Sequence, residues 1–162
     1  MEALTPLQQN RIVMMRNAID GDSAYSQGDG IPPAIRLYTA GAVDYALARK
    51  GIPGDYAEHA RQHFQAVLDL PDGQGQSRAV WAAYMLGRLQ QERFFATGNA
   101  EARAAAAHAF AQARALARQG APDPLSLAVA SYGEQARSYL MAGGSACGWK
   151  AFLTSAPCAD HI

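Results

Sequence analysis

The segment from Tyr38 to Phe64, YTAGAVDYALARKGIPGDYAEHARQHF, decides the fold because its landmark residues return later in the chain. Four landmark positions recur at a single offset of 46 residues: Tyr38, Gly41, Ala60 and Phe64, and then Tyr84, Gly87, Ala106 and Phe110. A small residue in the first helix of a hairpin lets the second helix approach closely, and the alanine of the second helix is expected to face that gap. The aromatic ring one turn later is expected to fill the space between successive hairpins. The repeat therefore predicts helical hairpins that bury their apolar faces by stacking.

Helix signals and turn signals alternate along the rest of the chain. Thr5-Pro6-Leu7-Gln8 has the form of a capping box with proline at the first helical position, and predicts a helix over residues 5–20. The segment from Gly21 to Pro33 is rich in glycine and proline and predicts a loop. Helical hairpins are expected over residues 32–71, 77–120 and 123–157, with a last helix opening at Ser145 and N-caps at Asp55, Ser77, Asn99 and Asp123. The chain is thus expected to be all-α, with about seven helices in a single domain over residues 1–162.

The order of these landmarks resembles the tetratricopeptide repeat, whose pattern has a glycine in the first helix, Ala-x-x-x-Phe in the second and a closing proline. The third unit matches the family spacing at Gly133, Ser145, Trp149 and Pro157. The first two units depart from it, because glycine and alanine stand 19 residues apart in each. The resemblance covers residues 34–158 and implies an α-solenoid of stacked antiparallel hairpins. The sequence also resembles segments of large, uncharacterised bacterial proteins, which would make the chain a fragment of a longer solenoid.

The resemblance implies that the first helices of the hairpins form a concave face that binds a protein or peptide. The expected contact positions lie about one turn either side of each glycine: Ile35, Tyr38, Ala42 and Tyr45 in the first unit, and Trp81, Tyr84, Arg88 and Gln91 in the second. Tyr, Trp and Arg are frequent binding hot spots. The alternative is that Tyr38, Trp81 and Tyr84 are buried between helices.

Charge and hydropathy limit the kinds of partner that the chain is expected to bind. Fourteen basic residues balance fourteen acidic ones without a basic block, so nucleic acid is not expected as a partner. The longest strongly apolar run, residues 79–86, is far shorter than the roughly 20 residues that span a bilayer, so no membrane insertion is expected. No signal peptide is recognised, which leaves the compartment undecided: cytoplasmic by default, exported if the chain derives from a longer precursor. A homodimer through the C-terminal hairpin remains open.

No catalytic residue, metal ligand or cofactor is predicted. His59 and His63 share one helix face, but a third ligand is missing. Cys147 could pair with His161 as a nucleophile, yet no orienting group is evident, and whether Cys147 and Cys158 form a disulfide is open. The alternatives to a binding module are a structural segment of a larger solenoid and, with less support, a helical hydrolase.

Overall fold

The computed structural model describes residues 4–71 and 73–142, and this part of the chain is entirely helical. It contains seven helices: α1 (Pro6–Arg16), α2 (Gly21–Gln27), α3 (Pro33–Arg49), α4 (Tyr56–Leu68), α5 (Gln76–Thr97), α6 (Ala100–Arg118) and α7 (Leu127–Ala142). The expected all-α class is confirmed for the described residues.

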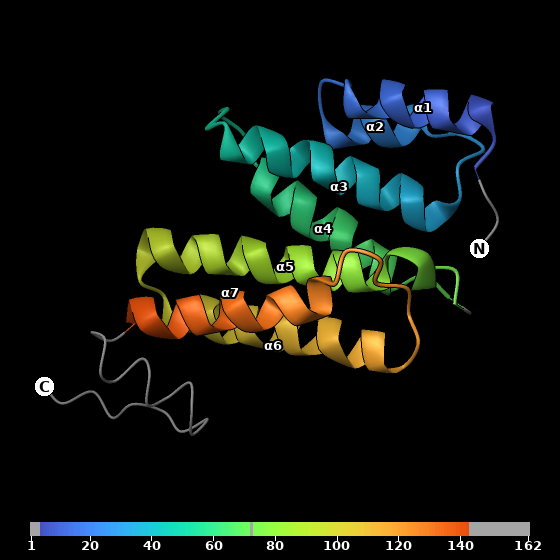
Figure 1. The fold of residues 1–162 in the computed structure, drawn as a ribbon. Coiled ribbons are helices and arrows are strands. Elements are labelled where there is room, and N and C mark those ends of the chain that lie inside the picture. Colours follow the sequence, from blue (N-terminus) through green and yellow to red (C-terminus); the bar gives the residue numbers. More distant parts are fainter. Residues whose placement is uncertain (1–3, 72, 143–162) are drawn as a thin grey trace, which may run out of the picture.

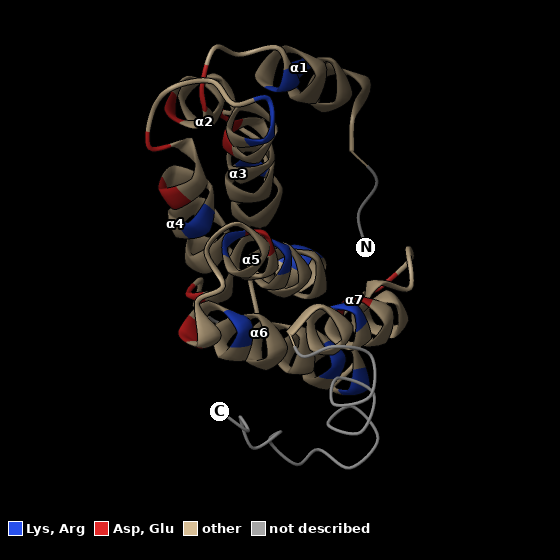
Figure 2. Cartoon of the chain, turned by 90° about the vertical axis from the view of Figure 1, so that its left-hand side faces the viewer, with Lys and Arg blue, Asp and Glu red and all other residues tan. Residues whose placement is uncertain are grey.

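The helices form two layers. Each odd-numbered helix contacts the next odd-numbered helix, and helices that follow one another in sequence also pack together. Figure 1 shows this succession from α1 and α2 at one end to α6 and α7 at the other. In Figure 2, α2, α4 and α6 lie on one side, and α1 and α7 are displaced to the other side of α3 and α5. The odd-numbered helices therefore follow an arc.

The repeated landmarks form two equivalent contacts between helices. Phe64 of α4 faces Gly41 of α3, and a Cβ atom at Gly41 would lie 2.8 Å from the Phe64 ring. Phe110 of α6 faces Gly87 of α5 in the same way, at 2.5 Å. Both rings are fully buried. Glycine thus allows each ring to touch the backbone of the other helix in its own hairpin. The sequence pattern predicted instead that the alanine would face the glycine and that the ring would fill the space between successive hairpins.

Each buried ring also contacts the tyrosine that opens its landmark set. The ring centroids of Tyr38 and Phe64 are 5.5 Å apart, and those of Tyr84 and Phe110 are 5.8 Å apart. Such tilted aromatic pairs stabilise a core beyond the area they bury. The 46-residue repeat in the sequence is therefore a repeat of interhelical packing.

The loop predicted over residues 21–33 is wrong, because its first half forms α2. The Asp20 side chain accepts a hydrogen bond from the Ser23 backbone N–H at 2.7 Å and so caps the helix. Gly21 is the first helical residue and Gly28 is the C-cap, so the glycines bound the helix rather than interrupt it.

The predicted N-caps had mixed outcomes. The capping box at Thr5 is confirmed, and Asn99 caps α6 by accepting from the Ala102 N–H at 3.0 Å. Asp55 makes no capping hydrogen bond through its side chain, and Ser77 lies inside α5, whose N-cap is Gly75. Asp55 therefore occupies the predicted N-cap position without the capping bond, and the prediction for Ser77 was wrong because α5 already begins at Gln76.

The end of the described chain differs in detail from the prediction. Asp123 accepts hydrogen bonds from the backbone N–H groups of Leu127 and Ala128, at 2.8 and 2.9 Å, so α7 begins at Leu127 rather than at Pro124. The helix predicted from Ser145 to Pro157 lies outside the described residues. Within the described ranges, no helix combines the length and the hydropathy needed to cross a bilayer.

Candidate functional site

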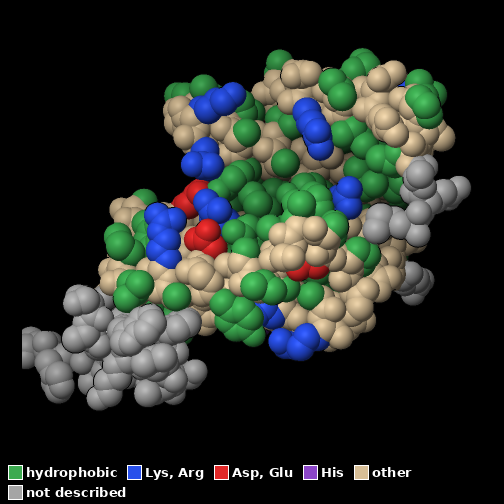
Figure 3. Space-filling view, in the orientation of Figure 1, with side chains coloured by type: hydrophobic (Ala, Val, Ile, Leu, Met, Phe, Trp, Pro, Cys, Tyr) green, Lys and Arg blue, Asp and Glu red, His purple; other side chains and the backbone are tan. Residues whose placement is uncertain are grey.

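A pocket of about 370 Å³ opens between α1, α3 and α5. Most of its wall is apolar, formed by Leu4, Ile12, Ile35, Ala42, Val43 and Ala46. Figure 3 shows hydrophobic side chains lining the hollow between α3 and α5. A largely apolar wall with a few polar groups is typical of protein sites that bind small molecules or single side chains of a partner.

Two aromatic side chains form the part of the wall between α3 and α5. The rings of Tyr38 and Trp81 meet edge to face, with centroids 5.5 Å apart. Both side chains are half-buried, so one side of each contacts the core and the other remains accessible. Burial raises the pKa of the Tyr38 hydroxyl. A tyrosine hydroxyl is protonated at neutral pH in any case, so it can donate a hydrogen bond.

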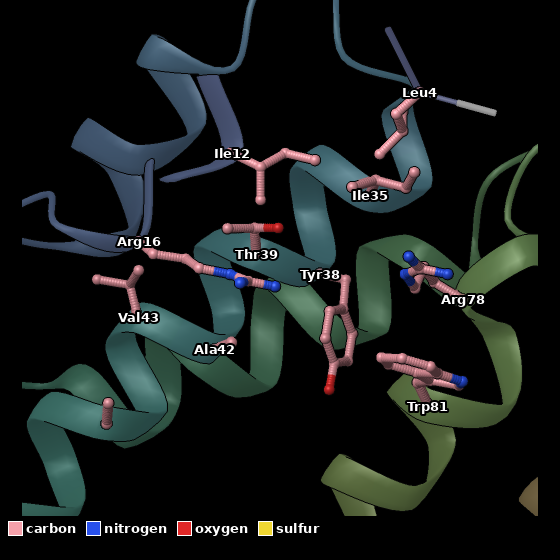
Figure 4. A pocket seen from close by; sticks show the side chains of 11 residues that line it. Leu4, Ile12, Arg16, Ile35, Tyr38, Thr39, Ala42, Val43, Arg78 and Trp81 are labelled. Carbon is pink, nitrogen blue, oxygen red and sulfur yellow. The ribbon is translucent and has the colours of Figure 1, made fainter. Parts of the chain in front are cut away.

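Arg16 and Arg78 line the same pocket from opposite sides (Figure 4). The Arg78 guanidinium lies 4.5 Å from the centroid of the Trp81 ring and donates one hydrogen bond, to the Ser77 carbonyl oxygen at 2.9 Å. Burial lowers the pKa of Arg78, and the positive charge of Arg16 lowers it further. Neither guanidinium forms an ion pair with a carboxylate of the described residues.

A second group of polar side chains lies away from this pocket and joins α3, α5 and α7. Arg88 stands 3.5 Å from carboxylate oxygens of both Glu92 and Glu134. The Tyr45 hydroxyl donates a 2.6 Å hydrogen bond to Glu92. Burial lowers the pKa of Arg88, but the Tyr84 side chain and the Glu134 carboxylate outweigh it, and the net pKa is raised. The Arg88 charge is therefore neutralised within the protein.

The expected contact positions divide between these two places. Ile35, Tyr38, Ala42 and Trp81 line the pocket. Tyr45, Tyr84, Arg88 and Gln91 belong to the polar group or border it.

Two of the expected contact residues are buried: Tyr84 is 8 % exposed and Gln91 is 1 % exposed. The Gln91 amide donates to the Glu134 carbonyl oxygen at 2.6 Å and to the Ser138 hydroxyl at 2.9 Å. These bonds join α5 to α7. The two side chains thus hold helices together in the described structure.

Sequence reasoning missed a polar contact centred on Asp44, which is 1 % exposed. Its Oδ1 accepts a hydrogen bond from the Gly21 N–H at 2.7 Å, and its Oδ2 lies 3.2 Å from Nδ1 of His63. Burial raises the pKa of the Asp44 carboxyl, although the Gly21 N–H and His63 oppose this effect. The available signal was a lone acidic residue three positions after Gly41, on the face of α3 that contacts other helices.

His59 and His63, both on α4, have different surroundings in the fold. His63 points to Asp44, and its Nε2 lies 3.6 Å from Oδ1 of the exposed Asp22, whereas His59 is exposed. Residues 4–71 and 73–142 hold no group of three or more His, Cys, Asp or Glu side chains placed to bind a metal ion. Cys147, Cys158 and His161 lie outside the described residues.

Sequence reasoning also missed Arg16 and Arg78 as pocket residues. Arg78 stands three positions before Trp81, so both project from the same face of α5, and this spacing was a usable signal. Arg16 comes from a different helix and reaches the pocket only through the packing of α1 on α3.

No family model, no curated protein and no solved structure matches this chain.

Proposed function

We propose that this protein is a tetratricopeptide-like α-solenoid that binds a peptide, or an exposed segment of another protein, along the face formed by α1, α3, α5 and α7. The contacts between successive odd-numbered helices and the repeated glycine–phenylalanine packing support the solenoid. The proposed role is binding, with no chemical step assigned to any side chain.

The observation that carries this proposal is the pocket beside Tyr38 and Trp81. It is lined by side chains from three helices, and half-buried aromatic rings form part of its wall. Its volume of about 370 Å³ suits one large side chain of a partner together with adjoining backbone. Aromatic side chains in such partly enclosed positions are frequent hot spots because a ligand displaces water from them at little entropic cost.

The test is a selection of random displayed peptides on the immobilised full chain, followed by the same selection on a variant with a filled pocket. Ala42 lies in the pocket wall, so Ala42→Phe places a ring in the space that a ligand needs. Ala107→Phe on α6 is the matched control, because Ala107 is also half-buried but lines none of the described pockets.

Peptides that bind the original chain and the Ala107 variant, but not the Ala42 variant, are the expected result. Failure to enrich any peptide, or equal enrichment on all three proteins, would refute a peptide-binding role for this face. Far-ultraviolet circular dichroism of both variants verifies that each substitution leaves the helical fold in place.

A second candidate is a structural segment of a larger solenoid, favoured by the exposed apolar side chains of α1. Leu7 is 69 % exposed and Met14 is 62 % exposed, and their spacing of seven residues puts them on one face of the helix. Such a face suits packing against a further hairpin or a second copy. Sedimentation equilibrium of the chain and of Met14→Lys tests it: a self-associating chain that the lysine makes monomeric supports this role, and a monomer in both cases refutes it.

A further inference from the structure

The pocket between α1, α3 and α5 carries positive charge that the described part of the protein does not neutralise. Arg78 is half-buried, and its guanidinium can donate five hydrogen bonds, of which one is made with a described residue, to the Ser77 carbonyl oxygen. Arg16 makes none with the described residues. Two cationic groups therefore border an apolar space with most of their donors unused.

Several arginines elsewhere in the described residues are paired, although Arg103 and Arg118, which line none of the described pockets, also lack a carboxylate partner. Arg36, Arg49, Arg61 and Arg88 each stand within ion-pair distance of a carboxylate. The contrast between Arg78 and Arg88 is the most informative, because both belong to α5. Burial lowers the pKa of both arginines, but Tyr84 and Glu134 bring the net pKa of Arg88 above its ordinary value. For Arg78 the opposing effect of Tyr38 does not offset burial and Arg16, and the net pKa is lowered. An acidic partner would thus find charge at the pocket that no described carboxylate compensates, and a satisfied ion pair at Arg88.

The orientation of Arg78 adds geometric selectivity. The Arg78 guanidinium stacks on the Trp81 ring, with 4.5 Å between the guanidinium carbon and the ring centroid. This stacking holds the planar group in one orientation. A fixed guanidinium presents a fork of N–H donors that matches the two oxygens of a carboxylate. An aliphatic or aromatic group attached close to that carboxylate would lie against the apolar wall of the pocket.

We propose that the pocket recognises an acidic peptide segment in which an Asp or Glu side chain binds between Arg16 and Arg78 and an adjacent apolar side chain enters the pocket. This inference rests on the proposed peptide-binding function and specifies its partner. The Arg88–Glu92–Glu134 group then serves to join the helices that border the groove, without binding the ligand's charge.

The peptides from the selection described above provide the test. Displayed peptides are joined to the phage through their C-terminus, so acidic character among the enriched sequences reflects side chains rather than a terminal carboxylate. Enriched peptides are then synthesised with acetylated and amidated ends, and their affinity for the full chain is measured by fluorescence anisotropy. Each is compared with a version that has Gln or Asn in place of Glu or Asp, and with a version that has phosphoserine there.

We expect the neutral peptide to bind about tenfold more weakly than the acidic one, because it loses one charge-assisted contact. Arg78→Gln should weaken binding of the acidic peptide by a similar factor, and Arg16→Gln by about threefold because Arg16 is more exposed. Arg118→Gln, an exposed arginine at the end of α6, should change it by less than about twofold. High salt should reduce binding of the acidic peptide more than that of the neutral one.

A charge reversal completes the design. Arg16 is exposed, so Arg16→Glu leaves the core untouched, and it should shift preference from the acidic peptide towards a version with Lys in its place. Enriched peptides that are neutral or basic, or equal effects of Arg78→Gln and Arg118→Gln, would overturn the inference while leaving peptide binding intact. A phosphoserine peptide that binds more tightly than its Glu counterpart would also overturn it, because phosphate would then be the preferred anion. The absence of any enriched peptide instead refutes the proposed function itself.

Discussion

Substitution of Gly87 by alanine probes the contact on which the repeat depends. In an open helix, Gly→Ala raises stability by about 1 kcal/mol because alanine has the higher helix propensity. At Gly87, however, the new Cβ would lie 2.5 Å from two atoms of the Phe110 ring, well inside normal contact distance. Phe110 is fully buried, so the ring cannot swing into solvent and the helices must separate.

The expected magnitude follows from these opposing terms. Overpacking of a core costs about 1 to 3 kcal/mol, and a Cβ 2.5 Å from a fully buried ring belongs in the upper part of that range, about 2 to 3 kcal/mol, of which the propensity gain of about 1 kcal/mol offsets part. We expect Gly87→Ala to lower the free energy of unfolding by about 1 to 2 kcal/mol, which corresponds to a fall in Tm of about 2 to 8 °C for a chain of this size. Gly41→Ala should have a smaller effect, since its Cβ would lie 2.8 Å from the Phe64 ring.

The assay is urea unfolding followed by circular dichroism, with the free energy of unfolding extrapolated to water. Gly133→Ala is the comparison, because no described atom lies within 4 Å of a Cβ there, and it should stabilise by about 1 kcal/mol. Combining Gly87→Ala with Phe110→Leu should cost less than the sum of the two single changes, because the smaller side chain relieves the clash. Strict additivity of the pair, or stabilisation by Gly87→Ala alone, would refute the role assigned to this glycine.

Three further predictions concern polar contacts. Burial raises the pKa of Asp44 in the folded chain above the unfolded value near 3.8. As the pH rises from that value through the folded pKa, the free energy of unfolding of the wild type should therefore fall relative to that of Asp44→Asn. Urea titrations that give parallel pH profiles for the two proteins would contradict this. Asn99→Ala should lower the free energy of unfolding by about 1 kcal/mol through loss of the α6 cap. Asp55→Ala removes no capping bond and should change this free energy by less than about 0.5 kcal/mol. Equal shifts in Tm for the two variants would argue against the cap assignment. Tyr45→Phe should lower stability by about 1 kcal/mol because it removes the hydrogen bond to Glu92, and an unchanged urea midpoint would show that this bond contributes nothing.

The positions of most helices could be predicted from local patterns. The capping box at Thr5, the proline before α3 and the cap at Asn99 are short-range signals, since each depends on atoms within a few residues of one another. That Gly41, Phe64, Gly87 and Phe110 are packing landmarks could be predicted because they recur at one offset, whereas the direct contact between each ring and the glycine of its own hairpin was not predicted. The helix α2 was missed because its bounding glycines were read as loop residues, although they mark its two ends.

The candidate site was only partly predictable. Tyr38 and Trp81 were expected on the binding face, and both line the pocket. The same reasoning placed Arg88 in contact with a partner, but it could not show that Glu92 and Glu134 neutralise that arginine. It also gave no reason to connect Arg16 with Arg78, which stand on different helices and far apart in the sequence.

The sequence alone therefore determined the all-α class, the position of most helices and the residues whose packing repeats, but not which of them touch. Propensity, capping and the period of the landmarks act over short stretches of chain, and all three can be read from neighbouring residues. Only the tertiary structure decided which cations are neutralised and which are left facing an apolar pocket. Charge compensation depends on distances of a few ångströms between side chains on different helices, and the arc of α1, α3 and α5 sets those distances.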